Sequence, residues 1–166
     1  MGVVRCAAAR PRPRERPRSD GVVRIVYMGT ATHDGELAFL APVADALRRR
    51  YGDRVRFEVV GGTAQRPPAG LCRRLPEGDA ANASYAGFVE WFGRQRWDIA
   101  VAPLMDDPFN RCKSAIKLMD YASLALPIVA SRHVEYEAAF GTDHGVVLVD
   151  NDVDRWVTAL AALIDD

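Results

Sequence analysis

The chain has 166 residues, of which 49% are hydrophobic and 27% charged, values typical of one soluble globular domain. Its 22 lysines and arginines balance its 22 aspartates and glutamates, and no apolar run approaches the roughly 20 residues of a membrane helix, so no transmembrane segment is predicted. Three cysteines without a C-x-x-C pair argue against a disulfide framework, and a cytoplasmic location is expected.

Residues 1–20 form a tail rich in arginine and proline. They carry six arginines against Glu15 and Asp20, a net charge of +4, so residues 21–166 sum to −4 and no nucleic-acid partner is predicted. The tail cannot build a core and is predicted to be disordered or extended, and it lacks the apolar stretch of a signal peptide. We favour an interdomain linker remnant or an over-extended gene start. A polybasic arm for anionic lipid or RNA, with peripheral membrane contact, stays open as the alternative.

The rest of the chain alternates between strand and helix patterns. Short apolar runs predict strands at 22–28, 55–60, 71–75, 99–102, 127–130 and 145–149. Helical apolar periodicity predicts helices at 37–50, 84–96, 113–125, 131–140 and 152–164. This alternation predicts a single Rossmann-like domain over residues 21–166, a three-layer α/β fold with a doubly wound parallel sheet.

In such a sheet, ligands bind beyond the carboxyl ends of the strands, near the switch in strand order. The first loop at such an end contains Gly29, Thr30, Thr32 and His33. Glycine lets the backbone approach a ligand closely, and hydroxyls with helix N-terminal amides favour an anion. The alternative is ordinary helix capping by Thr32 or Asp34, with His33 a solvated loop residue. The residues alone favour capping, because the loop has neither a GxGxxG nor a Walker pattern.

The helix predicted at 113–125 carries the two lysines of the chain. Lys113, Lys117 and Asp120 are spaced i, i+4 and i+7, which places them on one helix face, and Asn110 and Ser114 lie beside this face. A cation in the first turn of a helix is unfavourable unless an anion is bound beside it. The spacing therefore favours a phosphate followed by a sugar hydroxyl over a structural Lys117–Asp120 surface pair.

Other chemistries lack the residues they need. Asp106 and Asp107 have no third carboxylate or histidine nearby, so neither a metal nor another cofactor is predicted. At the third loop, 131–136, we expect Glu135 and Glu137 to be solvated helix residues and not catalytic carboxylates. A hydrolase would need a G-x-S-x-G motif or a cysteine with a histidine partner, and a receiver domain would need an acidic cluster after the first strand.

Several stretches of the sequence together resemble one family. They read Gly29-Thr30-x-Thr32-His33, Trp97-Asp98-Ile99-Ala100-x-Ala102-Pro103-Leu104, Pro108-Phe109-Asn110-x-x-Lys113-Ser114-x-x-Lys117-x-x-Asp120 and Leu126-Pro127-Ile128-Val129-Ala130-Ser131. In this order they resemble the C-terminal, donor-binding half of a retaining, group-1 type glycosyltransferase of GT-B architecture, over about residues 23–164. The resemblance implies a hexosyltransferase-type enzyme whose substrate is a nucleotide sugar.

The resemblance also implies a set of donor-binding residues: Gly29, Thr30, Thr32, His33, Asn110, Lys113, Ser114, Lys117 and Asp120. Lys113 would neutralise the diphosphate, Asp120 would accept from ribose hydroxyls, and the loop at Gly29 would approach the phosphates. The sequence departs from the family where a pair of glutamates eight positions apart is frequent, because these positions hold Cys112 and Asp120.

The acceptor-binding half of the family, with its catalytic residue, has no match in this sequence, so catalytic residues stay unassigned. Transfer by the chain alone is expected to be weak or absent unless a separate acceptor-binding half is supplied. The alternative hypothesis is a non-catalytic nucleotide-binding module, or the remnant of a truncated or split gene.

Overall fold

A computed structural model describes residues 20–76, 84–140 and 145–166. Six parallel strands form one sheet in the order β3-β2-β1-β4-β5-β6. The strands are β1 (Val23–Gly29), β2 (Val55–Gly61), β3 (Cys72–Arg74), β4 (Ile99–Ala102), β5 (Ile128–Ser131) and β6 (Val146–Val149). The helices are α1 (Asp34–Tyr51), α3 (Tyr85–Gly93), α4 (Ile116–Ser123), α5 (Val134–Phe140) and α6 (Val153–Asp165), with 3-10 turns η1 (Gly52–Arg54) and η2 (Asn110–Cys112). The predicted doubly wound parallel α/β fold is confirmed. The prediction for the tail falls on residues 1–19, which lie outside the described residues.

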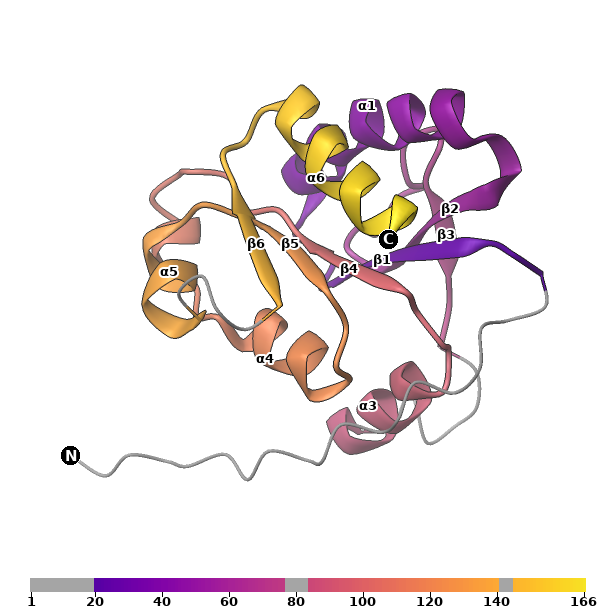
Figure 1. The fold of residues 1–166 in the computed structure, drawn as a ribbon. Coiled ribbons are helices and arrows are strands. Elements are labelled where there is room, and N and C mark those ends of the chain that lie inside the picture. Colours follow the sequence, from indigo (N-terminus) through magenta and orange to yellow (C-terminus); the bar gives the residue numbers. More distant parts are fainter. Residues whose placement is uncertain (1–19, 77–83, 141–144) are drawn as a thin grey trace.

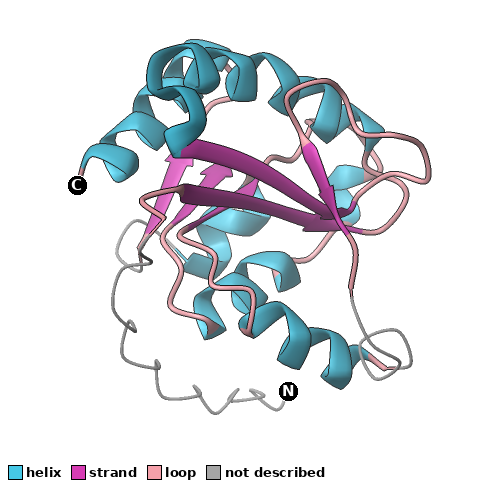
Figure 2. Ribbon diagram, turned by 90° about the vertical axis from the view of Figure 1, so that its right-hand side faces the viewer, coloured by secondary structure: helices cyan, strands magenta, loops and turns pink. Residues whose placement is uncertain are grey.

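Helices cover both faces of the sheet, which gives three layers (Figures 1 and 2). Alternate residues of β1 point to opposite faces, as the pleat of a strand requires. Ile25 and Tyr27 join the core under α1 and α6, and Val26 and Met28 join the core under α3 and α4. Each face therefore buries its own set of aliphatic and aromatic side chains, and the near-continuous apolar runs of the sequence follow from burial on both sides.

Two helix starts are fixed by side-chain caps at the predicted positions. Ser84 Oγ accepts a hydrogen bond of 3.0 Å from the backbone N–H of Gly87 at the start of α3. Asp152 Oδ1 does the same for the N–H of Arg155, also at 3.0 Å, at the start of α6. Both caps satisfy backbone donors that a helix N-terminus leaves unpaired.

The helix predicted at 113–125 is wrong at both ends, because α4 covers only Ile116–Ser123. Lys113 has an extended backbone, with φ −84° and ψ 142°. Asn110 holds the preceding chain in a loop, since its backbone N–H donates to Asp107 Oδ1 at 2.8 Å and its side-chain amide donates to the Met105 carbonyl at 3.0 Å. At the other end Ala125 takes a left-handed conformation, with φ 54°. The three residues at i, i+4 and i+7 therefore do not share one helix face.

The switch in strand order falls between β1 and β4, the two central strands. They pair only at Ile25–Ile99 and Val26–Ala100. Beyond this pairing the Tyr121 hydroxyl of α4 joins them, accepting from the Met28 N–H at 2.8 Å and donating to the Val101 carbonyl at 3.3 Å. The loops that leave β1 and β4 consequently start side by side, where ligands bind in sheets of this type.

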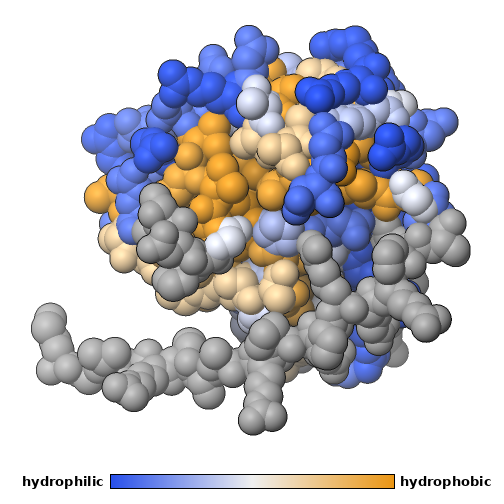
Figure 3. All heavy atoms as spheres, in the orientation of Figure 1, coloured by the Kyte–Doolittle hydropathy of each residue, from blue (hydrophilic) through white to orange (hydrophobic). Residues whose placement is uncertain are grey.

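The sheet ends at β6, whose paired neighbour is β5. Figure 3 shows apolar side chains gathered over this edge strand, and Val147 of β6 is 39% exposed.

Among the helices of the described residues, none has both the length and the apolar character needed to cross a membrane. The polar site described next lies at the carboxyl ends of the central strands.

Candidate functional site

The loop after β1 is fixed to the loop after β2 by backbone hydrogen bonds. The His33 N–H donates to the Gly62 carbonyl at 2.9 Å, and the Gly62 N–H donates to the Gly29 carbonyl at 2.7 Å. His33 occupies the N-cap position of α1 without a side-chain capping bond, and it is only 7% exposed. The capping alternative and the expectation of a solvated histidine are therefore wrong. Thr30 and Thr32 are exposed on the same loop, their hydroxyl oxygens 3.3 Å apart.

Gly61 allows this close approach of the two loops. It has φ +69°, and a Cβ atom built on it would lie 2.1 Å from the Gly29 carbonyl oxygen. We predict that Gly61→Ala lowers the free energy of unfolding by about 3 kcal/mol, because it adds a backbone clash to the strain of a left-handed alanine. Gly52→Ala is the control for backbone strain without a clash, with φ +59°, ψ −136° and open space around its Cβ, and is expected to cost about 2 kcal/mol. Urea unfolding of both variants measures the difference, and equal losses would contradict the clash.

The two lysines reach the carboxyl end of β1 from different elements. Lys113 Nζ, on the loop before α4, lies 3.5 Å from His33 Nδ1, and its side chain is 22% exposed. Lys117 Nζ, in the first turn of α4, donates to the Tyr27 hydroxyl at 3.1 Å and lies 4.3 Å from the centre of the Tyr27 ring. Tertiary structure thus brings the two ammonium groups together, although not through a common helix face.

Glu36 of α1 is a third charged residue at this place, and the sequence analysis missed it. Its Oε1 lies 3.4 Å from His33 Nδ1, 3.8 Å from Lys113 Nζ and 3.3 Å from Asn110 Nδ2. The residue is 3% exposed. One signal was present in the sequence, since Glu36 stands one turn before the core residue Leu40 on the buried side of α1. A carboxylate on the apolar stripe of a helix requires partners from elsewhere in the fold.

The charges of this cluster influence one another. Burial alone would raise the pKa of Glu36, but the hydrogen bond from His33 and the charges of His33 and Lys113 bring this pKa below its usual value. Burial lowers the pKa of Lys117 to about 7; the charge of Glu36 opposes this shift and that of Lys113 reinforces it. Burial raises the pKa of Tyr27, so its hydroxyl stays protonated beside Lys117. Near neutral pH the cluster therefore holds one carboxylate, one ammonium and a lysine close to its titration point.

Asp120 and Ser114 lie near this cluster in sequence but contact other surroundings. Asp120 accepts a hydrogen bond from the Tyr85 hydroxyl of α3, and burial raises the pKa of its carboxyl group. Since Lys117 instead points to Tyr27, the alternative of a Lys117–Asp120 surface pair is wrong. Ser114 is exposed between η2 and α4.

The last residue of β5, Ser131, holds the loops after β4 and β6 together. Ser131 Oγ accepts from the Leu104 N–H at 2.7 Å and donates to Asn151 Oδ1 at 2.5 Å, and Asn151 Nδ2 donates to the Leu104 carbonyl at 2.9 Å. Glu135 and Glu137, both in α5, are exposed as predicted. These contacts fix the positions of the loops at the carboxyl end of the sheet and involve uncharged groups.

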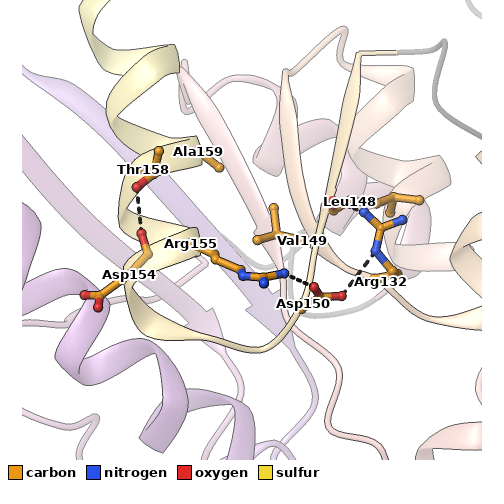
Figure 4. Close-up of a pocket in the computed structure, with 8 residues that line it drawn as sticks. All are labelled: Arg132, Leu148, Val149, Asp150, Asp154, Arg155, Thr158 and Ala159. Carbon is orange, nitrogen blue, oxygen red and sulfur yellow. Dashed lines mark hydrogen bonds and ion pairs between the residues drawn. The ribbon is translucent and has the colours of Figure 1, made fainter.

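An open hollow of about 400 Å³ lies beside β6 and α6 (Figure 4). Arg132 and Arg155 enter it from opposite sides, and both bind the same carboxylate, that of Asp150. Arg132 also bonds Glu137 at 3.3 Å. Two carboxylates, Asp150 and Glu137, balance the two arginines of the hollow. In the cluster around Lys113 two lysines share the single carboxylate of Glu36, so the hollow is the poorer anion site.

The fold is Rossmann-like, as in one half of a glycosyltransferase of GT-B architecture. The chain matches the family described as glycosyl transferases group 1 over residues 22–166, and it belongs to this family. None of the curated proteins matches it.

Solved structures with low sequence identity share the fold. TarM superposes with a TM-score of 0.64 at 10% identity, covering 95% of this chain and 30% of its own. WaaG, a glycosyltransferase involved in lipopolysaccharide biosynthesis, gives a TM-score of 0.59 at 11% identity, covering 89% of this chain and 39% of its own. An E. coli structure described as trehalose-6-phosphate bound with UDP-2-fluoro glucose gives a TM-score of 0.55 at 14% identity, covering 87% of this chain and 37% of its own. The chain thus spans well under half the length of these proteins.

Proposed function

We propose that the chain is the donor-binding half of a glycosyltransferase, which takes a sugar from a nucleotide sugar. The diphosphate of the donor would lie at the carboxyl end of β1, against Lys113 and Lys117. The observation that carries this proposal is the convergence of the only two lysines of the chain on one place at the switch point of the sheet. The UDP-2-fluoro glucose named for one structural relative supports a donor of this class.

The chemistry that follows is electrostatic. When the glycosidic bond to the donor phosphate breaks, negative charge develops on the departing nucleoside diphosphate, and ammonium groups fixed beside it lower the barrier. The backbone at Gly29 and the hydroxyls of Thr30 and Thr32 would approach the phosphates from the other loop. An acceptor hydroxyl would attack from a second half, supplied by another chain or segment, and that half would exclude water.

Asp120 is proposed to bind the ribose hydroxyls of the donor. Its carboxylate accepts a hydrogen bond from the Tyr85 hydroxyl, so it is already placed to accept from a hydroxyl group. A ribose hydroxyl would replace or share this bond. Tyr85 is 59% exposed, so it is able to move aside.

Direct binding tests the proposal. We expect calorimetry with UDP-glucose and GDP-mannose to give a dissociation constant in the range of about micromolar to millimolar for at least one of them. The site is open, and its charges are partly screened by water, so tighter binding is not expected. Failure of both ligands to bind at millimolar concentration would overturn the donor-site proposal.

Donor affinity is predicted to fall as the pH rises above about 7, where free Lys117 loses its proton. A bound diphosphate raises the pKa of Lys117, so binding takes up a proton between the free and the bound pKa values, and affinity falls by up to about tenfold per pH unit there. A nucleotide sugar has no phosphate proton that titrates in this range, so the slope reports the protein. Lys117→Met should give a flat profile from pH 7 upward, and Arg49→Met, at an exposed site on α1, should keep the slope. A steep profile in Lys117→Met would assign the proton to another group.

A further inference from the structure

We propose that Glu36 is a positioning residue of this donor site: its buried carboxylate holds the Lys113 ammonium and the His33 imidazole at the carboxyl end of β1, facing the diphosphate. The inference rests on the proposed function. Glu36 itself does not touch the donor in this arrangement, and it acts through Lys113.

The contacts of Glu36 join two loops that lie far apart in the sequence. His33 belongs to the loop after β1, and Asn110 and Lys113 belong to the loop after β4. All three place a nitrogen atom within 3.8 Å of the same oxygen, Glu36 Oε1. Asn110 is tied in turn to Asp107 Oδ2 at 2.7 Å, which fixes the turn that carries Lys113. One carboxylate thus sets the distance between the two loops that border the site.

Exposure gives the order of the charges from the interior to the solvent. The side chain of Glu36 is 4% exposed and that of Lys113 is 22% exposed. Glu36 therefore lies beneath the ammonium group, and an anion arriving from solvent meets Lys113 first. The four-carbon stem of a lysine has large rotamer freedom, and a fixed counter-charge under its head group removes much of that freedom before the ligand binds.

Glu36 also maintains the charge of the second lysine. The groups that face Lys117 are Tyr27 from β1, Glu36 from α1 and Lys113 from the loop before α4, with Asp120 one turn further along its own helix. Glu36 supplies the negative charge that keeps a proton on Lys117 against burial and against the repulsion of Lys113. Removing this charge while keeping the shape of the side chain would leave Lys117 neutral over a wider pH range.

The test compares Glu36→Gln with the wild-type chain by calorimetry against UDP-glucose and GDP-mannose from about pH 6 to about pH 9. Gln keeps an oxygen acceptor for Asn110 and removes the charge. We expect the affinity at about pH 7.5 to fall three- to tenfold, and the pH at which affinity begins to decrease to move down by about one unit. A residue that only stabilised the fold would not move this pH profile. Glu58→Gln is the matched control, since Glu58 is a second buried carboxylate, 3% exposed, on β2 beside Arg56.

A double-mutant comparison shows whether Glu36 acts through Lys113. In a Lys113→Ala background, adding Glu36→Gln should change the affinity at about pH 6 less than twofold, because the group that Glu36 positions is gone. Additive losses there, or an unchanged affinity and pH profile in Glu36→Gln alone, would overturn the positioning role. Absence of binding in the wild-type chain would instead overturn the proposed function, so the two failures are distinguishable.

Discussion

The 166-residue chain purified alone is expected to bind a nucleotide sugar and to transfer its sugar at a rate close to background. All the donor contacts proposed above lie at the carboxyl end of one sheet, where water has access to the phosphates and screens their attraction to the lysines. Orientation of two reactants in a closed site contributes roughly 7–11 kcal/mol to catalysis, and a single half supplies no surface that holds the acceptor. Loss of this contribution removes most of the rate enhancement.

The measurement is the release of nucleoside diphosphate and of glycosylated product over many hours, with a panel of hydroxyl acceptors. Donor binding is followed in parallel, so that an inactive chain is distinguished from an unfolded one. Activity should appear when an acceptor-binding half is added as a separate chain or as a covalent extension. Multiple-turnover transfer by the chain alone would contradict the prediction and would place the acceptor site within the residues of this sequence.

Lys113→Ala is expected to weaken the binding of a nucleoside diphosphate or its sugar by about 1–3 kcal/mol, or about 5- to 150-fold in the dissociation constant. The reason is a direct charge-assisted contact with phosphate, from an ammonium group held 3.8 Å from Glu36 and 3.5 Å from His33. Lys113→Arg keeps the charge and should retain part of the affinity, since its guanidinium has another shape and length.

Arg111→Ala offers a control two residues earlier in the same loop. The Arg111 side chain is 62% exposed and binds Asp106 through two hydrogen bonds, of 2.7 and 3.1 Å. The substitution Arg111→Ala removes a cation that is close to the site in sequence but lies outside the cluster. We expect it to change the dissociation constant less than twofold. If Lys113→Ala binds UDP-glucose or GDP-mannose as tightly as the wild-type chain does, Lys113 is not part of the donor site.

Lys113 stays a proposed phosphate ligand although it does not lie in a helix. The sequence periodicity predicts a helix from residue 113, with this lysine as a cation in its first turn. In the structure the side-chain amide of Asn110 competes successfully for the local carbonyl and carboxylate acceptors, so the chain stays in a loop until residue 115. The lysine in the first turn of α4 is Lys117, a half-buried residue whose ammonium group donates to an aromatic hydroxyl.

Local pattern determined the identity and order of nearly all the elements of this protein. Apolar runs that are buried on both faces predict parallel strands, and the alternation with amphipathic helices predicts the doubly wound sheet, because few topologies bury such segments with right-handed crossovers. Since ligands bind at the carboxyl ends of strands in these sheets, the loops after β1 and β4 were also identifiable from sequence alone.

Tertiary structure decided which side chains meet at those loops. Lys113 and His33 are 80 residues apart, and Asn110 and Glu36 are 74 residues apart, so no local periodicity records their contact. Glu36 resembles any acidic residue of a first helical turn until the fold buries it under the loop of another strand. Its charge then raises the pKa of Lys117 against the larger effect of burial. The electrostatic effect of a group depends on burial and on distances across the sheet, and only the folded chain fixes either of them.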